Sequence, residues 1–238
     1  MSALLYSTYL QWKLDLRSRT MLISCYAVPL VFFAFMGGVF TSVMPGYEQV
    51  LIPSMTVFAV SMGALIGLPP TLAEVYGTDV RKAYEANGVP LAAGLAASCL
   101  SAFVHLIIMS CILYALAPAM FDAALPADPG GYFLALAVFT AASLGYAGII
   151  GLVVKDPSIV PMVSILVFLP SIMLSGIMFP AEFLPEGFRA MGVVFPASWG
   201  YLLMGADTFE WNNLWPLLVM CAACVPGMAL LLRRSASR

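Results

Sequence analysis

Six long runs without a charged side chain constrain the fold of this chain more than any other feature. The runs cover residues 20–47, 49–73, 86–121, 129–154, 157–181 and 211–232. A membrane-crossing helix needs about 20 consecutive, mostly apolar residues, so each run can supply one crossing. A soluble fold is excluded, because a chain of 238 residues that is 62% hydrophobic and only 9% charged could not hide so much apolar surface from water. We therefore expect an all-α polytopic membrane protein that forms a single domain over residues 1–238. Its six transmembrane helices are expected near residues 21–43, 51–72, 94–117, 132–153, 158–179 and 213–232.

The placement of charge predicts the orientation of the spans. With six crossings and a cytoplasmic N-terminus, nine of the ten Lys and Arg residues lie inside and only Arg189 lies outside. Short cytoplasmic loops carry this excess of basic residues in membrane proteins. The overall net charge of −2 then divides into about +4 inside and −6 outside. We expect a multi-pass protein of a bacterial-type inner membrane with both termini in the cytoplasm.

The apolar run at residues 190–206 is shorter than the other six and contains Pro196. It is interpreted as a re-entrant or interfacial outer segment between the fifth and sixth spans. A seventh span is the alternative, but it would carry the C-terminal arginines across the membrane, against the charge bias.

Residues 3–19 are expected to form an amphipathic helix on the inner membrane surface. Leu5, Tyr9, Trp12 and Leu16 recur at helical spacing, which predicts one apolar face with Trp12 at the level of the lipid headgroups. The alternative is a plain cytoplasmic extension of the first span.

Two segments outside the spans are candidates for function. Residues 74–90 form the most polar stretch between any two spans, and Asn87-Gly88 before Pro90 is typical of a helix end. A helix this short needs a partner to dock on, although an ordinary polar loop is the alternative. The outer segment 180–206 is punctuated by prolines, which predicts a structured cap at the outer membrane edge.

Several kinds of chemistry lack a sequence signature in this chain. There is no GxxxxGK[ST] phosphate-binding loop, and a basic patch for nucleic acid is missing. The lone histidine, His105, lies in the third span without an acidic residue in that span. A functional role, as a proton relay or a substrate contact, and a hydrogen bond to a neighbouring helix are the two interpretations. All five cysteines fall within spans, where they are interpreted as small packing residues.

Small residues recur every four positions at Ala59/Gly63/Gly67 and at Ser143/Ala147/Gly151, a pattern that serves close helix packing either within the chain or across a dimer.

Together these features resemble the permease subunit of type-2 ATP-binding-cassette exporters. The resemblance covers nearly the whole chain and rests on the layout, on Glu74-x-x-Gly77-Thr78 after the second span, and on Ser175-Gly176-x-x-Phe179-Pro180 followed by Leu184-Pro185. It implies that segment 74–90 is a coupling helix that docks in a separate ATPase subunit. The positions that match the family's coupling region are Glu74, Gly77, Thr78, Arg81 and Lys82. After Gly77-Thr78 the sequence departs from the Leu-Glu that is common in the family.

The resemblance also implies the assembly and its cofactors. Two permeases, identical or different, would pair with two ATPases, and the first, second and fifth spans would line the path. ATP and Mg would be bound by the ATPase, with no cofactor, metal or catalytic residue on this chain. The outer re-entrant cap would include Phe179, Pro180, Pro185 and Pro196, and membrane lipid would surround the spans. The expected substrate is amphipathic or lipid-like, and the sequence does not identify it.

Two other functions stay open at this stage. An ion-coupled secondary transporter is disfavoured by span interiors without Asp, Glu, Lys or Arg. A non-transport membrane assembly protein is the second alternative.

Overall fold

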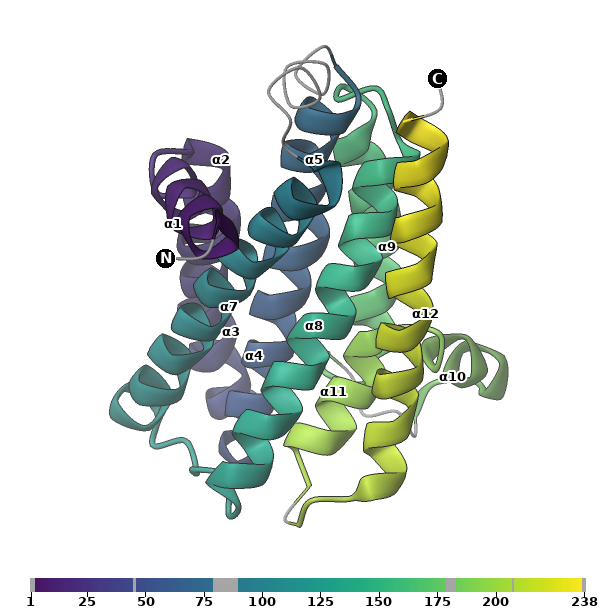
Figure 1. The fold of residues 1–238 in the computed structure, drawn as a ribbon. Helices are drawn as coiled ribbons and strands as arrows, with labels where there is room; N and C mark the ends of the chain where they lie inside the picture. Colours follow the sequence, from purple (N-terminus) through teal and green to yellow (C-terminus); the bar gives the residue numbers. More distant parts are fainter. Residues whose placement is uncertain (1–2, 45, 79–89, 179–182, 207, 237–238) are drawn as a thin grey trace.

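The computed structural model describes residues 3–44, 46–78, 90–178, 183–206 and 208–236, and within these residues the chain is helical and contains no strand (Figure 1). The elements are α1 (Ala3–Asp15), α2 (Arg19–Leu22), η1 (Ile23–Ala27), α3 (Val28–Val43), η2 (Tyr47–Gln49), α4 (Leu51–Met62), η3 (Gly63–Gly67), α5 (Leu68–Tyr76), α7 (Leu91–Phe121), α8 (Pro129–Val153), α9 (Val160–Met173), α10 (Glu186–Gly192), α11 (Pro196–Met204) and α12 (Trp211–Ala236). This confirms the expected all-α class.

Five continuous helices are long and apolar enough to cross a membrane. They are residues Arg19–Val43, Leu51–Tyr76, Leu91–Phe121, Pro129–Val153 and Trp211–Arg234. They coincide with five of the six predicted spans.

The predicted fifth span, near residues 158–179, is shorter as a helix than expected. α9 has 14 residues, or about 21 Å at 1.5 Å per residue, against about 30 Å of hydrocarbon core. It ends because the Ser175 hydroxyl donates to the carbonyl of Ile172 and Gly176 has a left-handed φ of +91°. A residue with a side chain rarely adopts that backbone conformation.

The second span, α4–η3–α5, is the centre of the bundle. Nearly every residue from Leu51 to Gly67 is buried, whereas the first and last spans expose most of their surface. The other spans pack around it, and α8 lies between α5 and α12.

Both of the first two spans contain a five-residue π-helical turn, η1 and η3, and these two turns pack against each other. Proline follows each turn, at Pro29 and at Pro69, and lacks the N–H that would continue the regular ladder. Gly63 allows the contact, because a Cβ there would lie 3.1 Å from Cys25 Sγ.

The small-residue stripes serve packing within this chain. A Cβ on Gly63 would also lie 2.3 Å from the Leu106 side chain of α7, and a Cβ on Gly151 would lie 2.8 Å from Leu72 Cβ of α5. The sequence left open whether the stripes pack within the chain or across a dimer; these two positions are occupied by the chain's own helices.

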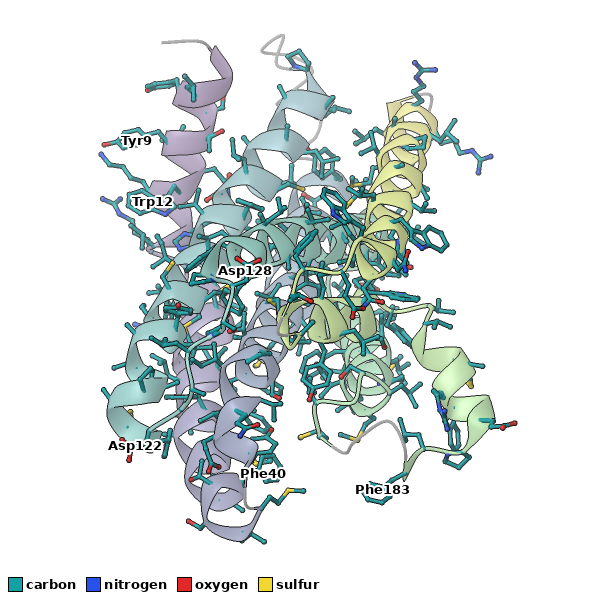
Figure 2. The ribbon with its side chains drawn as sticks, turned by 90° about the horizontal axis from the view of Figure 1, so that it is seen from below. Tyr9, Trp12, Phe40, Asp122, Asp128 and Phe183 are labelled. Carbon is teal, nitrogen blue, oxygen red and sulfur yellow. The ribbon has the colours of Figure 1, made fainter. Side chains whose placement is uncertain are left out.

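α1 lies across the spans rather than along them. It is seen almost end-on in Figure 1 and lengthwise in Figure 2, where Tyr9 points away from the other helices. α1 packs on α7. Of the four residues predicted to share one apolar face, Leu5, Tyr9 and Leu16 are exposed and Trp12 is partly buried.

Candidate functional site

Three of the five predicted coupling residues lie at the end of the second span. Glu74 is exposed in the last turn of α5, Gly77 caps that helix by donating its N–H to the carbonyl of Ala73 at 2.8 Å, and the Thr78 hydroxyl donates to the carbonyl of Glu74. Arg81 and Lys82 lie outside the described residues, as does most of segment 74–90. The structure therefore shows how the segment leaves the bundle.

Gly77 is in close contact with the turn that follows the fourth span. A Cβ at this position would lie 2.3 Å from the carbonyl oxygen of Lys155 and 2.6 Å from that of Ala73. Both neighbours are backbone atoms, which cannot move aside as a flexible side chain could. Glycine at position 77 thus lets the end of the second span meet the turn after the fourth span.

Tyr76 connects the two ends of segment 77–90. Its hydroxyl donates a hydrogen bond of 2.8 Å to the carbonyl of Leu91, the first residue of α7, and its side chain is 5% exposed. The second and third spans are therefore joined directly where the polar segment leaves and re-enters the bundle. Sequence reasoning missed this contact, because nothing in the sequence pairs a tyrosine with a backbone carbonyl 15 residues later.

The turn against Gly77 is held by its own hydrogen bonds. Asp156 accepts from the N–H of Ser158 at 2.9 Å and from the Ser158 hydroxyl at 2.6 Å. These bonds to the ionised carboxylate lower the pKa of Asp156 below its usual value. The turn that contacts Gly77 is thus ordered by hydrogen bonds of its own.

The outer segment contains two short helices that each begin after or at a proline. Pro185 precedes α10 as its N-cap, and Pro196 is the first residue of α11. The other two predicted cap residues, Phe179 and Pro180, lie outside the described residues.

Hydrogen bonds fix the turn between these two helices. The carbonyls of Gly192, Val193 and Val194 accept from the Ser198 hydroxyl, the Trp199 indole and the Tyr146 hydroxyl, at 2.7, 2.9 and 2.8 Å. Because Tyr146 belongs to α8, the turn is attached to the bundle.

α11 lies within the bundle, whereas α10 projects from it (Figure 1). α11 packs on α8, α12 and α4, and Gly200 allows the contact with α8, since a Cβ there would lie 2.6 Å from the Phe139 ring. α10 and Phe183, three residues before its start, expose large apolar side chains: Phe183 is 78% exposed and lies at the edge of the molecule in Figure 2. Phe188 and Met191 on α10 are also exposed.

A buried polar cluster between α1, η1 and α7 was not predicted. The carboxylate of Asp15 is 6% exposed and accepts from Gln11 Nε2 at 2.9 Å and from the Ser101 hydroxyl at 2.6 Å. The sequence placed Asp15 among cytoplasmic charges. Its position four residues after Gln11 is consistent with the first bond, but the second joins residues 86 positions apart.

His105 lies in the same cluster and is fully buried. Its Nδ1 shares a hydrogen bond of 2.7 Å with Tyr26 Oη, and its ring stacks on Trp12 with centroids 6.0 Å apart. The hydrogen bond to a neighbouring helix, one of the two expected roles, is confirmed. Neither His105 Nε2 nor Trp12 Nε1 has a hydrogen-bond partner among the described residues.

Aromatic rings connect the first two spans with α9. Phe58 of α4 stacks on Phe32 of α3, with centroids 3.8 Å apart, and meets Phe168 of α9 edge-on at 5.8 Å. The outer faces of α3 and α9 expose large apolar side chains next to this contact, among them Phe35 and Leu166, at 66% and 64%.

Comparison with known proteins gives one result. The family model described as ABC-2 type transporter matches residues 3–205, from α1 to just beyond α11. No curated protein matches the chain.

Proposed function

The chain belongs to the ABC-2 type transporter family, the membrane components of ABC transporters, and we propose that it is the permease of an exporter driven by a separate ATPase subunit. In this proposal the ATPase binds ATP and Mg, and the chain moves an amphipathic or lipid-like substrate out of the cytoplasm. The permease itself is not the catalytic component.

The observation that carries the proposal is the attachment of segment 77–90 at both ends. Tyr76 bonds to the carbonyl of Leu91, and Gly77 meets the carbonyl of Lys155. A force applied to the segment by an ATPase would therefore act on the second span, the third span and the turn between α8 and α9 together. This is the mechanical property that a coupling segment requires. Glu74, Thr78, Arg81 and Lys82 are the proposed contacts with the ATPase.

The proposed path lies between two permeases, on the side formed by the first, second and fifth spans. The Phe32–Phe58–Phe168 contact joins these three spans, so a shift of the second span would displace the other two. In this proposal the exposed apolar faces of α3 and α9 contact a second permease in place of lipid.

The proposed topology has six crossings with both termini inside. α9 would cross as a short helix extended by the non-helical residues after it, of which Ser175, Gly176 and Ile177 are buried. Shelter by protein is the condition for irregular backbone at membrane depth. α11, at nine residues or about 13 Å, would enter only part of the outer leaflet as a re-entrant helix.

Co-purification with ATP hydrolysis tests this proposal. The tagged chain is extracted from its own cells, and ATPase activity of the purified complex is measured with and without the double substitution Arg81→Glu/Lys82→Glu. We expect an ATP-binding-cassette subunit to co-purify with the chain and to be lost from the double variant. Arg17→Glu/Arg19→Glu is the matched control, since it reverses two exposed basic residues on the same predicted side without touching segment 74–90. Transport that runs on a proton gradient without any ATPase would overturn the proposal.

A further inference from the structure

An apolar groove of about 390 Å³ lies between α7, α8 and α12. Its walls include Ala96 and Leu100 of α7, Ala141 of α8, and Cys221, Val225 and Met228 of α12. Leu100 and Val225 are 40% and 63% exposed, so the groove opens sideways toward the surrounding membrane. None of the first, second and fifth spans lines it, which separates it from the proposed path.

The groove exists because α12 packs closely on α8 while α7 diverges from it. A Cβ on Gly145 would lie 2.7 Å from Cys224 Cβ, and one on Gly148 would lie 2.4 Å from Met228 Sδ, so these two glycines bring α12 against α8. α7 runs away from α12 on the other side of α8 (Figure 1). The backbone of α8 therefore forms the floor, and α7 and α12 form the walls.

Ordered water would be an unfavourable occupant of this groove. A buried water needs two to four polar partners, and the side chains named above have no strong donor or acceptor to supply them. An empty space of this size would forfeit van der Waals contacts along all three helices. A hydrocarbon chain from the membrane is therefore the favourable occupant of an apolar groove that opens to the bilayer.

The basic residues near the groove, and their distance from it along α12, indicate which kind of lipid would bind. The groove lies in the half of the bundle where α7 begins and α12 ends, the half that the charge distribution places in the cytoplasmic leaflet. Exposed Arg233 and Arg234 end α12, and exposed Lys155 follows α8. Arg233 lies 12 residues beyond Cys221, or about 18 Å along the helix, while half the hydrocarbon core is about 15 Å. A chain whose end reaches Cys221 would place its headgroup at the level of these basic residues.

We propose that this groove binds one acyl chain of an inner-leaflet phospholipid with an anionic headgroup, whose phosphate pairs with the basic residues at the ends of α8 and α12. Basic clusters at the cytoplasmic ends of transmembrane helices attract anionic lipid headgroups. The bound lipid would fill the wedge between α7 and α12 and hold the third span against the sixth. The site does not depend on an ATPase partner.

Native mass spectrometry of the purified chain tests the proposal. Palmitoyl-oleoyl phosphatidylglycerol or the corresponding phosphatidylcholine is added in detergent, and the apparent dissociation constant of each retained lipid is measured. We expect one tightly retained phosphatidylglycerol. Since each basic residue near the membrane surface strengthens anionic lipid binding about fivefold, Arg233→Gln/Arg234→Gln should lower the preference for phosphatidylglycerol by roughly thirtyfold. Arg19→Gln/Arg17→Gln, at the start of the first span, should leave it unchanged.

Two substitutions that fill the groove distinguish binding at this site from nonspecific contact with lipid. Ala141→Leu places a larger side chain in the groove and should abolish the tight site, and Ala96→Leu should do the same from the opposite wall. Ala115→Leu is the matched control, because Ala115 is exposed on the half of α7 away from the groove. Equal retention of phosphatidylglycerol by the Ala141→Leu and Ala115→Leu variants would overturn the proposal. Equal affinity of the unmodified chain for phosphatidylglycerol and phosphatidylcholine would also overturn it. A change in oligomeric mass with Ala141→Leu would also overturn it, since the occupant would then be a helix of another chain.

Discussion

The Ser101 hydroxyl of α7 donates a hydrogen bond of 2.6 Å to the Asp15 carboxylate of α1, and both residues are buried. This bond attaches the helix that lies across the bundle to the third span, which begins directly after the polar segment 74–90. α1 is therefore held by specific polar contacts as well as by any affinity of its apolar face for the membrane surface.

Ser101→Ala should loosen the attachment of α1. A hydrogen bond to a charged group contributes about 1.5–3 kcal/mol, so we expect a loss of about 2 kcal/mol in the free energy of unfolding. Thermal and denaturant unfolding in micelles would measure it. Ser110→Ala is the control, because the Ser110 hydroxyl, also buried on α7, bonds only to the carbonyl of Leu106 in its own helix. Equal losses for the two variants would argue against a special role for the Asp15 contact.

Gly77→Ala should separate the end of the second span from the turn after the fourth span. The new Cβ would overlap the carbonyl oxygen of Lys155, and forcing extra volume into a packed site costs about 1–3 kcal/mol. We expect lower stability together with a loss of transport-coupled ATP hydrolysis in the reconstituted complex. Gly187→Ala is the matched control, since a Cβ there meets nothing within 4 Å. If both variants behave like the unmodified chain, Gly77 is not a required contact.

Tyr76→Phe should release the start of α7. The substitution removes the bond to the carbonyl of Leu91 and keeps the aromatic ring, at a cost of about 1 kcal/mol. Hydrogen–deuterium exchange followed by mass spectrometry should show faster exchange in the first turns of α7. Tyr114→Phe, a partly buried tyrosine farther along the same helix, provides the comparison. Unchanged exchange in residues 91–98 would show that the bond does not hold the helix start.

The turn at Asp156 should respond to acid. Its pKa is lowered in the folded chain, so the ionised form stabilises the turn above the unfolded pKa, and this contribution disappears as pH falls through the folded pKa. Ser158→Ala removes both the hydroxyl donor and its effect, and we expect the pKa of Asp156 to rise toward its usual 3.8. Carboxyl ¹³C chemical shifts of labelled aspartate, recorded against pH, would measure the change. An identical titration in both proteins would contradict the assigned cause.

The sequence alone predicted the helical class, five of the spans at nearly their observed positions, and the polar segment between the second and third spans. These features follow from apolar runs and from the placement of charge, both of which are local along the chain. α10 begins after Pro185 and α11 begins at Pro196, where proline suits a helix start, but these prolines were not predicted from the sequence as helix starts.

Only the tertiary structure decided which side chains meet. The chain's apolar residues can face lipid or another helix equally well, so composition cannot place Trp12 against His105 rather than at the membrane surface. Asp15 and Ser101, Tyr76 and Leu91, and Gly77 and Lys155 are brought together by packing between separate elements. Hydropathy thus determined that this chain spans a membrane. The close approach of particular backbones, made possible by glycines, decided how the ends of the second and fourth spans meet and how α12 packs on α8, while a buried hydrogen bond attaches the transverse helix.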